Sequence, residues 1–229
     1  MTLDAPNGGE HLCAGTTATI QWTVSIAHVT LNWDLEYSTT GSMGPWIPIA
    51  TDLPAGDTSA GSVHTYAWTV PAAPTTLGRV RVKQDNSGVD CTDFSDLDFT
   101  IHGPASATFR ADNAGVNATG YLAAPPVLGA LWTASVDNGQ TGNTLAGVAG
   151  YAGPLDLLLS FGFLLVDITD PNGELLQLPL QAGTGVVGFS LSIPDDPALC
   201  GIPFATRGYG LGGGAGIRLH NAYDLVLGG

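Results

Sequence analysis

Alternating apolar and polar residues between positions 29 and 37 give the clearest periodic signal in this chain. A period of two places one set of side chains on one face of a strand and the other set on the opposite face. The segment therefore predicts a half-buried β-strand with the inward set Val29, Leu31, Trp33, Leu35 and Tyr37.

Several other short segments of the first hundred residues repeat this period. They are residues 18–24, 65–70 and 79–83, with a last strand from Leu97 to Ile101. Short strands separated by turn residues favour a β-sandwich. The Gly-Pro pair that follows predicts a domain boundary, so we expect one domain over residues 1–102, a linker over 103–106 and a second domain over 107–229.

The second half alternates apolar stretches with turns of Gly, Pro and Asp. Phe163–Ile168, a DPNG turn and Glu174–Leu180 predict a hairpin, and residues 185–193 and 202–207 predict further strands. Several of these segments are apolar on both faces, as in strands buried inside a sandwich or beneath a partner. We therefore expect a second β-sandwich, for which a jelly roll is one arrangement.

Composition supports an all-β chain and narrows its partners. The 32 glycines and 15 prolines disfavour helix interiors. A net charge of −14 disfavours nucleic acid and anionic lipid as partners. The richest apolar run, Leu157–Ile168, is shorter than a membrane span, so we expect no membrane insertion. Residues 1–9 have no secretory signal, so any signal peptide is absent from this numbering.

Six sequence words follow one another in the first hundred residues: PNGGE, TIQWT, LEYSTTGSMGPWIPIA, YAWTVP, RVRV and DFSDLDFTI. In this order they resemble the immunoglobulin-like repeats of bacterial secreted and surface proteins of the Ser/Thr-rich membrane-anchored, yeast cell-wall-synthesis type. The resemblance implies a seven-strand-like sandwich that acts as an extracellular or cell-surface spacer or adhesive unit without a catalytic centre. With the module aligned in this way, we expect a disulfide between Cys13 and Cys91 at its edge, which fits an oxidising compartment.

The second half resembles a C-terminal β-module of large secreted proteins of environmental bacteria, whose function is unassigned. The resemblance rests on the words GPLDL-x-L-x-FG, IPDDPALCG and NAYDLVLG. Paired cysteines of related modules have no counterpart here, so we interpret Cys200 as a buried small hydrophobe.

Motifs for catalysis or cofactor binding are weak. Two G-x-G-x-x-G matches lack a following helix segment, and the five histidines lack metal-ligand spacing. We therefore predict no enzyme, no cofactor and no metal ligand among the histidines. The best calcium candidates are Asp167, Asp170, Asn172 and Glu174, although a turn between strands explains them more simply.

Carbohydrate binding would require exposed aromatic side chains. Trp22, Trp33 and Trp68 fall on the inward phase of their strands, and Trp46 is expected at a sandwich edge. Trp132 is ambiguous. Four tyrosines near turns or strand ends are candidates for a stacking face: Tyr121, Tyr151, Tyr209 and Tyr223.

Two functions stay open from the sequence. The first is a non-catalytic extracellular protein that self-associates into a homo-oligomer or polymer, such as a filament or surface layer. The alternative is a monomeric carbohydrate-binding or adhesion module with a glycan partner. The candidate assembly residues are apolar positions and a glycine run of the second half: Leu157, Leu159, Phe161, Phe163, Gly212, Gly213 and Gly214.

Overall fold

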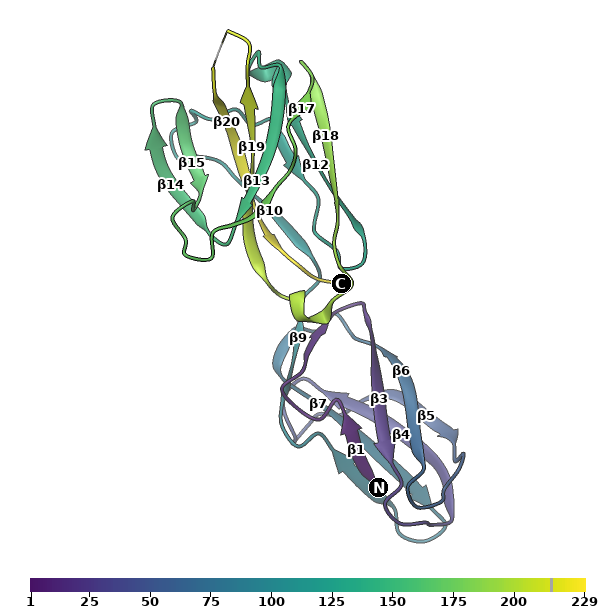
Figure 1. Ribbon diagram of the computed structural model, residues 1–229. Coiled ribbons are helices and arrows are strands. Elements are labelled where there is room, and N and C mark those ends of the chain that lie inside the picture. The colour runs from purple at the N-terminus through teal and green to yellow at the C-terminus, as the bar shows by residue number, and fades with distance from the viewer. Residues whose placement is uncertain (215) are drawn as a thin grey trace. The chain divides into compact units, whose positions relative to one another are not determined.

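The computed structural model describes residues 1–214 and 216–229 (Figure 1). The chain divides into two compact units, Met1–Pro104 with Gly229, and Ala105–Gly228. Both units are built almost wholly of strands, as the alternating pattern predicts. Among the described residues, no helix is long and apolar enough to span a membrane.

The first unit is a sandwich of two sheets. The smaller sheet has the order β1-β3-β6, and the larger has the order β2-β9-β7-β4-β5, with β8 also paired to β7. Apart from the short β2 beside β9, these two orders correspond to the A-B-E and G-F-C-C′ strands of an immunoglobulin-like sandwich. The strands are β1 Thr2–Ala5, β2 His11–Cys13, β3 Thr17–Thr23, β4 Thr30–Ser38, β5 Ile47–Pro54, β6 Val63–Thr69, β7 Thr75–Asn86, β8 Cys91–Phe94 and β9 Phe99–His102.

The core of the first unit lies between these sheets and follows the predicted phase. It contains Ile20 and Trp22 from one sheet, and Trp33, Leu35 and Val82 from the other. Burying large apolar side chains in this way provides the main driving force for folding.

The predicted phase of residues 29–37 is wrong at its start. Val29 is 72% exposed and Leu31 is 59% exposed. The pairing of β4 with β7 shifts register between Thr30 and Asn32. Because such an irregularity changes the direction of the side chains before it, the inward face begins only at Trp33.

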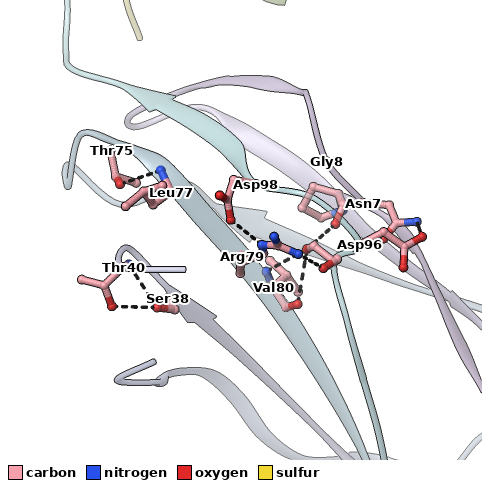
Figure 2. A network of polar contacts seen from close by, with 12 residues as sticks. Asn7, Gly8, Ser38, Thr40, Thr75, Leu77, Arg79, Val80, Asp96 and Asp98 are labelled. Atoms are coloured by element: carbon pink, nitrogen blue, oxygen red, sulfur yellow. Dashed lines mark hydrogen bonds and ion pairs between the residues drawn. The ribbon is translucent and has the colours of Figure 1, made fainter. Parts of the chain in front are cut away.

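A polar network fixes the N-terminal PNGGE segment to the loop between β8 and β9 (Figure 2). The backbone N–H of Asp96 donates to Asn7 Oδ1 at 2.8 Å, and Asn7 Nδ2 donates to Asp96 Oδ2 at 2.9 Å. Nearby, Arg79 forms an ion pair with Asp98 and donates to the Ser95 carbonyl. This sequence word therefore has a structural role.

The second unit has three layers. A sheet of order β10-β20-β19-β13-β16, with β17 also on β13, faces the sheet β11-β12-β18, and β14 pairs with β15 as a separate hairpin. Its elements are β10 Ser106–Arg110, β11 Tyr121–Ala123, β12 Leu131–Asp137, η1 Asn138–Gln140, β13 Leu145–Tyr151, β14 Pro154–Leu159, β15 Gly162–Val166, β16 Glu174–Gln177, β17 Gln181–Ala182, β18 Val186–Ser192, η2 Pro197–Leu199, β19 Pro203–Leu211 and β20 Arg218–Val226.

Two apolar clusters hold these layers together. Tyr121, Trp132 and Phe189 belong to the large cluster of the sandwich. Leu164 and Ala205 belong to a smaller cluster that joins the hairpin to the larger sheet. The extra hairpin layer explains why this part of the sequence is apolar on both faces.

The predicted hairpin of Phe163–Ile168 with Glu174–Leu180 is wrong. β15 pairs with the preceding strand β14, whereas β16 pairs with β13. The DPNG segment therefore connects two different sheets. Apolar stretches bounded by turn residues indicated both strands, but such a pattern carries no information about which strand pairs with which.

Candidate functional site: unprotected sheet edges

Strand β18 forms one edge of the sheet β11-β12-β18. Its seven residues pair with β12 from Val186 to Ser192 without a register shift. The strand contains no charged residue and no proline. Val187 and Phe189 point into the core, while Val186 is 72% exposed. A regular edge of this kind presents backbone donors and acceptors that can pair with another strand.

Strand β6 is a comparable edge in the first unit. It ends the sheet β1-β3-β6, and its seven residues pair with β3 from Val63 to Thr69 without a shift. The strand contains no Lys, Arg, Asp or Glu, and its titratable side chains are His64 and Tyr66. Each unit thus has one long, regular edge strand without a fixed charge.

The remaining edges have features that oppose pairing. Prolines, charges and bulges disrupt a continuous row of edge hydrogen bonds, and short strands offer few of them. These features are Asp4 and a register shift in β1, Pro48, Pro54 and two shifts in β5, Arg110 in β10, Asp156 and a shift in β14, Glu174 in β16, and lengths of two to four residues in β2, β8, β11 and β17. The edge of β15 has no charge or proline, but side chains of its own unit occupy it: Asn117 bonds the N–H and the carbonyl of Phe163, and Arg110 donates to the Leu165 carbonyl.

The predicted assembly residues of the apolar run lie on the hairpin and its turn. Leu157 is 45% exposed and Phe161 is 37% exposed. Leu159 packs against the small cluster beneath the hairpin, and Phe163 is half-buried. An assembly role for the two exposed side chains stays a prediction, whereas Leu159 contributes to the fold of the unit.

The glycine run is held within its own unit. Asn143 Nδ2 donates to the Gly212 carbonyl at 2.8 Å. A Cβ on Gly212 would lie 2.5 Å from Thr144 Oγ1, and one on Gly213 would lie 2.4 Å from the Gly142 carbonyl oxygen. Both glycines have positive φ, so substitution there would strain the turn. Gly214 has open space around it.

The candidate calcium residues form turn contacts. Asp167 Oδ1 accepts from the Thr169 N–H at 2.9 Å, and Asp170 Oδ1 accepts from the Asn172 N–H at 2.7 Å. Hydrogen bonds to the carboxylate lower the pKa of Asp167. Glu174 accepts from Tyr151 Oη instead. Within the described residues, no group of three or more His, Cys, Asp or Glu is placed to hold a metal ion.

The aromatic side chains do not form one open platform. Trp22, Trp33, Trp68 and Trp132 are all at most 4% exposed. The half-buried Trp46 carries the Arg81 guanidinium over its ring at 4.4 Å, a cation–π contact. Four of the five tryptophans are therefore core residues and cannot stack on a sugar.

The four candidate tyrosines also fail to form one stacking face. Tyr121 is fully buried, and its hydroxyl donates to Thr206 Oγ1 at 2.9 Å. Its ring contacts Tyr223 edge to face. Tyr151 packs instead against the small cluster beneath the hairpin. Tyr209 covers Gly147, where a Cβ would lie 2.3 Å from Tyr209 Cζ.

The predicted Cys13–Cys91 disulfide is wrong. Cys91 has a free, half-buried thiol, whereas Cys13 and Cys200 are disulfide-bonded. The interpretation of Cys200 as a simple buried hydrophobe is therefore also incorrect. The alignment with the immunoglobulin-like module placed Cys91 near a strand end, but that spacing does not define which thiols meet in space.

A buried polar pair lies on strands β19 and β20. Arg207 is 2% exposed and His220 is fully buried. Arg207 Nη2 donates to the His220 carbonyl at 3.1 Å. Burial, with a smaller effect of the Arg110 charge, lowers the pKa of Arg207 to about 10. Burial and the Arg207 charge lower the pKa of His220 to about 4, so at neutral pH this imidazole is neutral beside a charged guanidinium.

Comparisons with known proteins do not identify a family. No family model matches the chain, and no curated protein matches it. The resemblance of the first hundred residues to bacterial secreted repeats therefore stays a prediction, while the immunoglobulin-like strand order is a feature of the fold.

Three of the solved structures that are similar to this chain are distant likenesses. A titin A168–169 structure is 13% identical, with 100% of this chain and 98% of that chain covered and a TM-score of 0.30. A chimeric titin Z1Z2-Z1Z2 tandem is 11% identical, with 99% and 98% covered and a TM-score of 0.27. Native Escherichia coli alpha-2-macroglobulin is 13% identical, with 98% of this chain but 14% of that chain covered and a TM-score of 0.25. At these scores, none of the three supports a function for this chain.

Proposed function

We propose that this chain is a non-catalytic structural or adhesive protein of the cell exterior whose copies associate through sheet edges. The observation that carries the proposal is the pair of regular, uncharged edge strands, β6 and β18. Natural β-proteins usually protect such edges from other chains. The other edge strands of this chain carry charges, prolines or bulges, are short, or are covered by side chains. Because β6 and β18 lack this protection, we infer that they pair with strands of another molecule. The disulfide-bonded Cys13 and Cys200 are consistent with an oxidising compartment.

A second copy of β18 is a suitable partner for β18. Antiparallel pairing across a two-fold axis at Phe189 would place Gly188 opposite Ser190 and Val187 opposite Leu191. The outward residues of these pairs, Gly188 and Ser190, are small and uncharged. The pairing therefore brings no like charges together. The new strand pair would extend the sheet β11-β12-β18 into the second molecule.

Two edges on one chain also determine what kind of assembly can form. One self-complementary edge produces a closed dimer, because its surface is used up by the two-fold contact. A chain with a second edge can bind a further molecule there, and repetition of both contacts produces an open polymer. The proposed filament or layer therefore requires both β6 and β18.

A charge placed on each edge tests the proposal. Ser190→Lys puts a lysine on the exposed face of β18, and Ala67→Lys does the same on β6. The matched controls are Thr133→Lys and Thr19→Lys. These exposed residues pair directly with Ser190 and Ala67, but they lie on the inner strands β12 and β3.

Sedimentation velocity, light scattering and negative-stain electron microscopy over a concentration series measure the outcome. We expect the parent chain and both controls to form particles whose mass increases with concentration, each edge variant to stop at a dimer, and the double edge variant to be monomeric. Circular dichroism checks that every variant is folded. A monomeric parent chain at all concentrations, or assembly unchanged by both edge lysines, would overturn the proposal.

A further inference from the structure

His11 and His102 are 91 positions apart in the chain but adjacent in space. Strands β2 and β9 pair in parallel, with His11 opposite Thr100 and Cys13 opposite His102. His11 Nδ1 and His102 Nε2 are 2.8 Å apart. The sequence contains no short-range spacing that could have indicated this pair, because it depends on the pairing of the second strand with the ninth.

The two rings are stacked, and one nitrogen of each faces the other across a hydrogen bond. Their centroids are 5.1 Å apart, and their planes differ by 19°. In the metal-free pair, one nitrogen donates a proton and the other accepts it. His11 is exposed, so its ring can turn about its side-chain bonds and direct a lone pair to a shared ion.

We propose that His11 and His102 form a two-histidine site for a divalent transition metal ion, with Cu²⁺ preferred. Imidazole nitrogens bind such ions at about 2.0–2.1 Å, and two ligands at a right angle are then about 2.9 Å apart. The observed 2.8 Å separation is close to this value. A tetrahedral angle would require about 3.3 Å, and a small turn of the exposed His11 ring reaches either separation, so the preference for copper rests on the ligand type and not on this distance.

The remaining coordination positions would be occupied by water or by a ligand from another molecule. No third His, Cys, Asp or Glu joins the pair within the described residues. Copper is favoured over nickel and zinc because the affinity of nitrogen ligands for divalent ions is highest for Cu²⁺. The site is thus an open, exchangeable one, distinct from a closed structural metal centre.

Calorimetric titration of the full chain with CuCl₂ tests this proposal. The protein carries Cys91→Ser, which removes the free thiol, and the buffer is non-coordinating at pH 7.5. The variants are His11→Asn and His102→Asn, and the control is His28→Asn, which removes an exposed loop histidine outside the pair. Electron paramagnetic resonance counts the nitrogens bound to copper.

We expect one copper per chain with two nitrogen ligands. Loss of either histidine should weaken binding by about a hundredfold, because the second imidazole binds intramolecularly. The control should bind like the parent chain. Binding that is unchanged in both pair variants, or that His28→Asn weakens equally, would show adventitious surface binding only and overturn the proposal. A copper signal with a single nitrogen ligand would do the same.

Discussion

Lowering the pH should destabilise the second unit through His220. This side chain is fully buried, and neither of its ring nitrogens has a hydrogen-bond partner in the part of the chain that the structure describes. Burial is the main cause that lowers its pKa from 6.5 to about 4, and the nearby Arg207 charge adds to it. The charge of Asp137 acts in the opposite direction. The folded unit therefore resists protonation of an imidazole that the unfolded chain protonates readily.

The sign and size of the effect follow from the two pKa values. Between pH 6.5 and pH 4 the unfolded chain binds a proton that the folded chain does not, so the free energy of unfolding decreases as the pH is lowered. The difference between 6.5 and about 4 corresponds to about 3 kcal/mol, at about 1.36 kcal/mol for each pH unit. The destabilisation that results from burying His220 is absent above pH 6.5. It grows as the pH is lowered and reaches its full value below pH 4.

Hydrogen-exchange mass spectrometry can read this effect locally. The free energy of opening of β20 is measured between pH 7.5 and pH 4.5, with correction for the intrinsic exchange rate. The comparison is with His220→Asn, which cannot titrate, and with His28→Asn, which removes an exposed histidine of the first unit. We expect the pH-dependent loss in the parent chain and in His28→Asn, but not in His220→Asn. Identical pH dependence in the parent chain and in His220→Asn would refute the reasoning.

Two further predictions concern a buried charge and the thiols. Arg207→Met should stabilise the second unit by about 1–3 kcal/mol in urea unfolding, because the guanidinium is 2% exposed and its Nε and Nη1 atoms have no hydrogen-bond partner among the described residues; a loss of stability would contradict this account. Alkylation of the native protein without reductant should label Cys91 and neither of the other two cysteines. Peptide mapping by mass spectrometry checks this, and labelling of a second cysteine would refute it.

The sequence by itself determined the strands and much of their inward faces. Alternation identified Trp33, Leu35, Ile20 and Trp22 as core residues, and all four are at most 2% exposed. The prediction succeeds because successive side chains of a strand point to opposite faces. A buried face therefore appears in the sequence as an apolar residue at every second position. Composition likewise indicated an all-β chain, because glycine and proline weaken helices wherever they occur.

Only the tertiary structure decided which strands and side chains meet. It paired β15 with β14 instead of β16, left the Cys91 thiol free and placed His11 beside His102. It also made β6 and β18 edges while β3 and β12, with the same local period, became inner strands. The physical reason is that the period of a strand is local, whereas its partner is selected by the packing free energy of residues distant in the chain.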